Sequence, residues 1–141
     1  MPSPVRPMWT DGNGARAAGT ERVLGQARLA EIDPVLLMDL RGWLERPLGD
    51  ATPQVYRDVT IVVGELMTNA FRHAEPPFDV RLAVPLSGRG VRVEVGDSTV
   101  SPATGWPLGK GLLIVRDLCA GWGVERRPDG KVVWAEVTKA T

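Results

Sequence analysis

One stretch decides the fold, Val59–His73, which reads VTIVVGELMTNAFRH. Apolar residues recur in it at spacings of three and four, the period of one face of an α-helix. Glu65, Asn69 and His73 recur at spacings of four, so the same helix carries a polar stripe beside its apolar one. The pattern predicts a long helix with a carboxylate, a carboxamide and an imidazole in line at the edge of a core. A solvated polar edge is the simpler interpretation, because such side chains usually face water.

Two helix-start signals precede and open this region. Thr52-Pro53 and Asp33-Pro34 each place a capping side chain before a proline, which suits the first helical position. We therefore expect the central helix to begin at Thr52-Pro53 and to last to about His73. An earlier helix is expected to run from Asp33-Pro34 towards Arg46.

The remaining segments predict mainly strands. Residues 22–30, 78–84 and 91–97 alternate apolar and polar positions, and residues 122–127 and 131–138 form a hairpin that turns at Pro128-Asp129-Gly130. An irregular loop over residues 98–108 leads to a helix that Gly109-Lys110-Gly111 opens, that ends near Ala120 and that Gly121 closes. Because the strands come in antiparallel pairs, we expect an α+β fold, a two-layer sandwich with helices on one face of a mainly antiparallel sheet.

The length of 141 residues suggests one domain. Residues 1–19 are rich in Pro, Gly and Ala and predict a flexible N-terminal tail, in which Trp9 is an exception that could dock somewhere. Residues 20–141 are expected to form the domain. Lys and Arg together number 17, as do Asp and Glu, which argues against a direct nucleic-acid or membrane-surface binder.

Cysteine content and hydropathy bear on the compartment. The single cysteine, Cys119, lies in an apolar helical pattern and is expected to be a small buried residue, and it excludes an intrachain disulfide or a cysteine metal cluster. The first residues lack the apolar segment of a signal peptide, and no apolar run is long enough to cross a bilayer. We therefore expect a cytoplasmic protein.

Three groups of residues stand where they could bind a nucleotide. Glu65 and Asn69 offer a carboxylate and a hard oxygen ligand of the kind that Mg²⁺ prefers. Asp97 ends a predicted strand, where it could accept a hydrogen bond from an adenine amino group. Gly109-Lys110-Gly111 opens a helix, whose free amide groups attract phosphate. Each signal is weak when it stands alone.

Together and in this order, these motifs resemble those of the GHKL (Bergerat-fold) histidine-kinase-like ATPases, and more closely those of the anti-sigma-factor serine/threonine kinases. The resemblance runs from about Thr52 to Val137. It is carried by GELMTNAFRH at residues 64–73, by GKGLLIV at residues 109–115, and by WGV at residues 122–124 with GKVVWAE at residues 130–136.

The resemblance implies an ATP site that uses Mg²⁺. Asn69 would hold the metal on the phosphates, and Glu65 would be the catalytic carboxylate that prepares a partner's hydroxyl group. His73 would lie near the phosphates, and Asp97 would read adenine. The phosphate-binding segment would consist of Gly109, Lys110, Gly111 and Leu112.

The same resemblance implies protein partners. They are a sigma factor, which the chain would sequester, and an anti-anti-sigma protein of the STAS type, whose serine or threonine would be phosphorylated. Relatives often form homodimers, so a homodimer is possible here.

Two departures from the family pattern keep an alternative open. The run from Asp97 to Ser101 lacks the family's glycines, and Val132 stands where the family often has a threonine whose hydroxyl helps to bind adenine. The alternative is a non-catalytic protein-binding module of the same fold with weak or no nucleotide binding. The catalytic half of a two-component histidine kinase is disfavoured, because His73 is the only histidine and belongs to the central helix.

Overall fold

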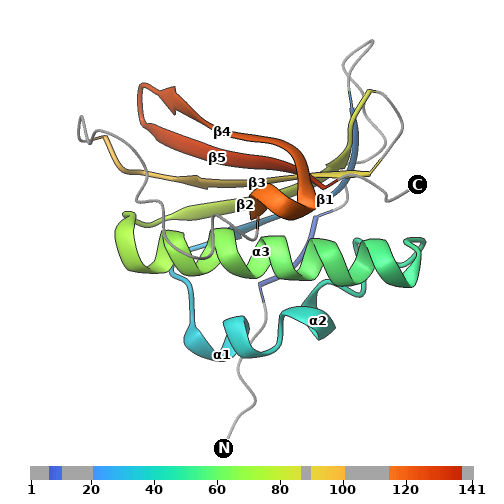
Figure 1. The fold of residues 1–141 in the computed structure, drawn as a ribbon. Helices are drawn as coiled ribbons and strands as arrows, with labels where there is room; N and C mark the ends of the chain where they lie inside the picture. Colours follow the sequence, from blue (N-terminus) through green and yellow to red (C-terminus); the bar gives the residue numbers. More distant parts are fainter. Residues whose placement is uncertain (1–6, 11–20, 87–89, 101–114, 138–141) are drawn as a thin grey trace, which may run out of the picture.

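The computed structural model describes residues 7–10, 21–86, 90–100 and 115–137, and these residues form two layers (Figure 1). Five strands make one antiparallel sheet in the order β1-β2-β3-β5-β4, and helices cover one face of it. The α+β sandwich predicted from the sequence is confirmed. The named elements are β1 Arg22–Leu29, α1 Pro34–Met38, α2 Leu40–Trp43, α3 Pro53–His73, β2 Phe78–Val84, β3 Val91–Asp97, β4 Cys119–Arg127 and β5 Gly130–Val137.

The central helix α3 has the bounds that the sequence predicts. The side chain of Thr52 accepts a hydrogen bond from the backbone amide of Val55 at 3.3 Å, and Pro53 occupies the first turn. The helix packs against β3 and β5. Its buried side is almost wholly apolar and comprises Val59, Val62, Val63, Leu66, Met67 and Ala70, with Asp58 at its start.

The earlier helix is shorter than predicted. The chain forms α1 and α2, two brief helices separated at Asp39, whose backbone amide donates to the carbonyl of Leu36 and closes α1 after little more than one turn. The expected continuous helix to Arg46 was therefore wrong. The apolar residues Leu36, Leu40 and Trp43 are nevertheless all buried.

The last helix also ends earlier than predicted. Residues 115–118 are helical, and β4 begins at Cys119, so Ala120 and Gly121 lie in a strand rather than at a helix end. The pairing of β4 with β5 shifts register between Cys119 and Gly121. Cys119 is half-buried and lies in β4, so the expectation of a buried residue in a helix was wrong. Burial, and then the negative charge of Asp58, raises the pKa of its thiol to about 12, which disfavours the reactive thiolate.

The two faces of the sheet differ in chemistry. On β3, Val91, Val93 and Val95 point into the core beneath α3, as alternation along a strand requires. On the opposite face, the guanidinium of Arg92 contacts Glu94 at 2.8 Å and lies 4.3 Å from the centre of the Trp134 ring. An antiparallel sheet with one polar face is the expected result of this pattern.

Part of the N-terminal segment is docked on the domain. Trp9 is buried and its ring stacks on that of Trp43, with 4.2 Å between ring centres. The Trp9 indole donates to the carbonyl of Trp43, the Trp43 indole donates to the carbonyl of Pro7, and both distances are 2.7 Å. Thr10 pairs with Gln26 of β1. Trp9 thus docks on the domain, and most of the expected tail lies outside the described residues.

Candidate functional site

The polar stripe on α3 is the first component of the site. Glu65 and Asn69 are half-buried, and His73 is exposed at the end of the helix. Within the described part of the chain, none of these three side chains makes a hydrogen bond or an ion pair. A half-buried carboxylate and a half-buried amide one turn apart, both without partners among the residues that the structure describes, have their oxygens available for a ligand.

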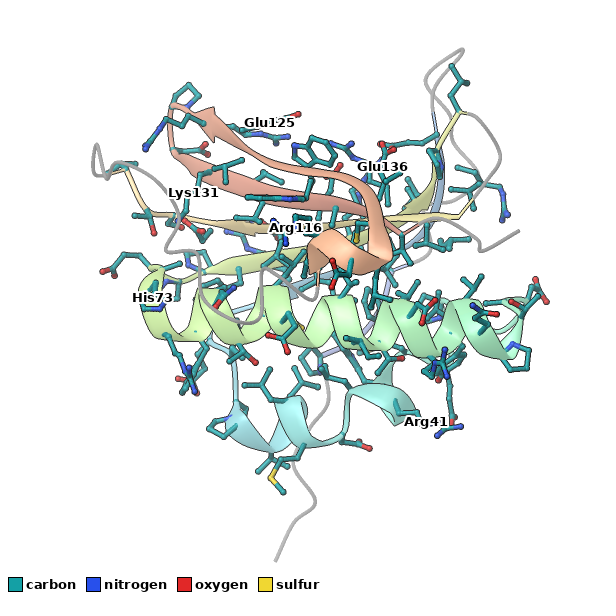
Figure 2. All side chains as sticks on the ribbon, viewed as in Figure 1. Arg41, His73, Arg116, Glu125, Lys131 and Glu136 are labelled. Carbon is teal, nitrogen blue, oxygen red and sulfur yellow. The ribbon has the colours of Figure 1, made fainter. Side chains whose placement is uncertain are left out.

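The end of α3 is tied to the end of β3. The backbone amide of Ser98 donates to the carbonyl of Glu75 at 2.9 Å, and the amide of Glu75 donates to Thr99 Oγ1 at 2.9 Å. These bonds bring the residues just after α3 beside the residues just after Asp97. Figure 2 shows His73 and Lys131 at this same end of the molecule, on α3 and on β5.

Asp97 is the buried polar group at this end. Its side chain is only 1 % exposed, and it lies on the α3-facing side of β3 in line with Val95. Asp97 Oδ2 accepts from Lys131 Nζ at 2.8 Å, and Oδ1 accepts from the backbone amide of Thr99 at 2.8 Å. Both carboxylate oxygens therefore already have donors within the chain.

Lys131 is the site residue that the sequence analysis did not select. It stands directly opposite Asp97 in the pairing of β3 with β5, and its side chain is 11 % exposed. The pairing register of β3 with β5 is the feature that would have identified Lys131. However, the order of strands along the chain does not reveal that β5 pairs with β3 as well as with β4.

The structure corrects the expectation about Val132. Strand alternation places position 132 on the sheet face away from α3, where Val132 lines a cavity of about 360 Å³ with Gly96 and Glu94. Lys131 and Val133 are the neighbours that face α3. A hydroxyl group at position 132 would therefore lie on the sheet face away from Asp97.

Gly130 allows the backbone of β5 to approach Asp97 closely. A Cβ atom at this position would lie 1.8 Å from the carbonyl oxygen of Asp97 and 3.1 Å from the Cα of Ser98. Only glycine permits this approach, which positions the start of β5, and so Lys131, beside Asp97.

The remaining predicted residues are not placed. Gly109, Lys110, Gly111 and Leu112 lie outside the described residues, as does Ser101 at the end of the run that departs from the family pattern. The structure thus brings Asp97 and the C-terminal end of the α3 stripe to one end of the molecule, and it leaves the phosphate-binding segment as a prediction.

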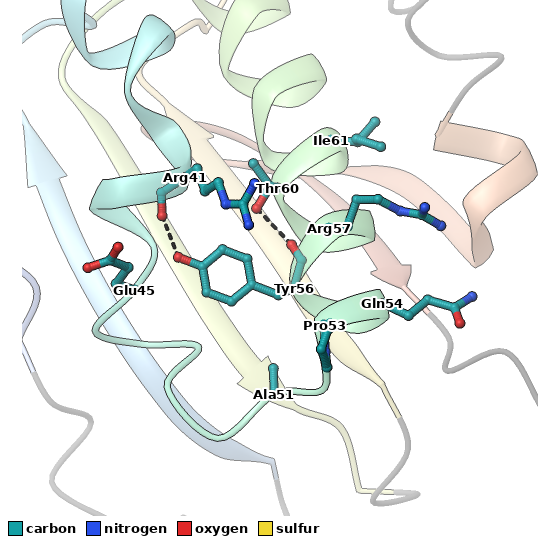
Figure 3. Close-up of a pocket in the computed structure, with 9 residues that line it drawn as sticks. All are labelled: Arg41, Glu45, Ala51, Pro53, Gln54, Tyr56, Arg57, Thr60 and Ile61. Carbon is teal, nitrogen blue, oxygen red and sulfur yellow. Dashed lines mark hydrogen bonds between the residues drawn. The ribbon is translucent and has the colours of Figure 1, made fainter.

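A larger cavity, of about 750 Å³, lies at the other end of α3 (Figure 3). Tyr56 and Arg41 are among the residues that line this cavity, and the Tyr56 hydroxyl donates to the backbone carbonyl of Arg41. Burial raises the pKa of the Tyr56 phenol, Glu45 adds to the rise and Arg41 opposes it. This cavity shares none of its described lining residues with the Glu65–Asn69–His73 stripe, so it is a separate feature.

Comparison with known proteins identifies one family. Residues 26–137 match the family model of the histidine kinase-like ATPase domain. A comparison with curated protein sequences gave no significant match. Within the described residues, no helix combines the length and the apolar character needed to span a membrane.

Proposed function

The chain belongs to the histidine kinase-like ATPase family, and we propose that within it the chain acts as a Mg-ATP-dependent protein serine/threonine kinase of the anti-sigma-factor type. Its partners in this proposal are a sigma factor, which it sequesters, and a STAS-type anti-anti-sigma protein, which it phosphorylates. Family membership supports ATP binding and a regulatory role. The kinase activity and the partners rest on the motifs described above.

The observation that carries the proposal is the pair formed by Glu65 and Asn69. Both side chains are half-buried on one face of α3, one turn apart, and neither has a partner among the described residues. In the proposal the Asn69 carbonyl oxygen binds Mg²⁺, which when bound neutralises charge on the phosphates. Glu65 accepts the proton of the partner's hydroxyl group, and His73 lies near the phosphate end.

The test separates binding from transfer. Glu65→Gln keeps the size of the side chain but removes the basic oxygen, so it is expected to bind Mg-ATP as the wild type does and to lose phosphoryl transfer by at least about a hundredfold. Binding is measured by isothermal titration calorimetry. Transfer is measured from γ-labelled ATP to STAS-type proteins encoded in the same genome.

Glu31→Gln is the matched control, because Glu31 is exposed and lies before α1, far along the chain from the stripe. It is expected to retain both activities. Undiminished transfer by the Glu65→Gln protein would remove Glu65 from the mechanism.

A second candidate is a protein-binding module of the same fold without catalysis. It is favoured by the glycine-free run after β3 and by the engagement of both Asp97 oxygens with donors in the chain. The two candidates differ in whether Mg-ATP binds to the folded protein at all.

A further inference from the structure

We propose that Lys131 sets the base selectivity of the nucleotide site, by occupying the carboxylate of Asp97 that would otherwise read adenine. The inference rests on the proposed ATP-binding function and concerns the same site. Its consequence is that the chain holds a nucleotide mainly by the phosphate end and discriminates poorly between purine bases.

The geometry of Asp97 is the first step. Lys131 Nζ donates to Oδ2 and the amide of Thr99 donates to Oδ1, each at 2.8 Å, and only 1 % of the side chain is exposed. An incoming adenine amino group must therefore displace a donor or open the contacts around the carboxylate before it can bond to Asp97.

The competition favours Lys131 over adenine. Both an ammonium ion and an adenine amino group would make a charge-assisted hydrogen bond to the carboxylate, but only the ammonium ion also brings an opposite charge that forms an ion pair with it. The Lys131 side chain is only 11 % exposed, so solvent screens this pair weakly. A neutral adenine amino group cannot compensate a buried carboxylate that has lost its cation.

The fold holds Lys131 in this position. Asp97 and Lys131 are direct Cα partners of β3 and β5, and the close approach at Gly130 holds the start of β5 against Asp97. The pair is therefore set by strand register and not by the chance rotation of a surface lysine.

Base selectivity follows from the donor and acceptor pattern of purines. Adenine presents an amino donor where guanine presents a carbonyl oxygen, so a free carboxylate attracts adenine and repels guanine. A carboxylate already neutralised by an ammonium ion loses most of this contrast. A purely structural clamp between β3 and β5 is the alternative role for Lys131, and it predicts no change in base preference when Lys131 is replaced.

The experiment compares two nucleotides that differ only at the amino group, ATP and purine riboside 5′-triphosphate. Each is titrated by calorimetry in the presence of Mg²⁺ into the wild type, Lys131→Met and Lys131→Gln. The control is Arg127→Met, which removes a cation from the same hairpin but not from Asp97, since Arg127 contacts Glu125 at 3.8 Å. Circular dichroism verifies that each variant is folded.

The wild type and the Arg127→Met control are expected to bind the two nucleotides with affinities within about threefold of each other. Lys131→Met is expected to prefer ATP by about tenfold, the value of a hydrogen bond to a freed charged acceptor. Lys131→Gln retains a neutral donor that supports the fold, and its preference for ATP is expected to lie between those of the wild type and Lys131→Met. If Lys131→Met does not fold, the preference of Lys131→Gln distinguishes base selectivity from a purely structural clamp.

The outcomes separate the inference from the function on which it rests. The inference would be overturned if the Lys131 variants showed the same ratio of affinities for ATP and purine riboside 5′-triphosphate as the wild type, or if the wild type already preferred ATP tenfold. Either result would leave ATP binding intact. No binding of either nucleotide to any of these proteins would overturn the proposed function, and the inference with it.

Discussion

Asp97 and Gly130 show how a single position can shape the site. The carboxylate of Asp97 is buried and both of its oxygens accept hydrogen bonds. Gly130, the residue before the Asp97 partner Lys131, lets the two backbones approach to a distance that no side chain would tolerate. The contact is made by backbone atoms, which cannot rotate away as a side chain can. The geometry around Asp97 therefore depends on a residue that carries no functional group.

The Gly130→Ala substitution should be disruptive for this reason. Because the added methyl group would lie 1.8 Å from a carbonyl oxygen, β5 must shift, and we expect the free energy of unfolding to fall by about 1–3 kcal/mol. Urea denaturation followed by circular dichroism measures the change.

Gly49→Ala is the matched control for that substitution. Its added Cβ would have its closest contact at an ordinary 3.6 Å, and the position is exposed in a turn, so stability should change by less than about 1 kcal/mol. Equal stability of the Gly130→Ala protein and the wild type would show that the close approach is not a constraint.

At the scale of elements, residues 7–10 pack on the domain although they belong to the predicted tail. Trp9 lies between Trp43 of α2 and Gly25 of β1, and a Cβ on Gly25 would lie 3.0 Å from the Trp9 ring. Composition predicts flexibility for residues 1–19, but one large aromatic side chain with a hydrogen-bonded indole holds the four described residues of that range, 7–10, on the domain.

We expect Trp9→Ala to lower the free energy of unfolding by about 3 kcal/mol, because it removes a buried aromatic ring together with its stacking contact with Trp43. Met8→Ala is the neighbouring control, since Met8 is 78 % exposed and its loss should change stability by less than about 0.5 kcal/mol. Thermal unfolding by calorimetry compares the two. Similar melting temperatures for both variants would mean that the docking of Trp9 does not stabilise the domain.

For the whole molecule, the decisive property is the arrangement of one helix layer on one sheet face. α3 packs against β3 and β5, so its polar stripe and Asp97 belong to the same side of the sheet. The outer face is occupied by charged pairs such as Arg92 with Glu94 and Glu136. A ligand that touches both Asn69 and Asp97 must therefore bind on the helix side of the sheet.

Binding of Mg-ATP on that side should stabilise the folded protein. At a hundred times its dissociation constant, a ligand adds about 2.7 kcal/mol, which corresponds to a rise in melting temperature of about 5–10 °C for a chain of this size. Differential scanning fluorimetry with millimolar Mg-ATP tests this on the wild type.

The matched arms of that experiment are ATP without Mg²⁺ and Asn69→Ala with Mg-ATP, both of which should give a smaller shift. An unchanged melting temperature of the wild type at every nucleotide concentration would favour the non-catalytic module over the kinase.

Much of the architecture could be predicted because its signals are local. The period of apolar residues, the Thr52 and Asp33 caps and the turn at Pro128-Asp129 depend only on neighbours along the chain, and they predicted α3, the start of α1 and the last hairpin. The break at Asp39 was missed because the same apolar positions are buried whether the helix is continuous or interrupted.

By itself, the sequence determined the strands, the long helix and the stripe of Glu65, Asn69 and His73, because side-chain periodicity is a property of the local chain. Only the tertiary structure decided that β5 inserts between β3 and β4, which sets Lys131 against Asp97 and turns Val132 to the other face. Strand order arises from contacts between residues that are far apart in sequence. Neighbouring positions on β5 face opposite sides of the sheet, so Lys131 lies at the site and Val132 lies outside it.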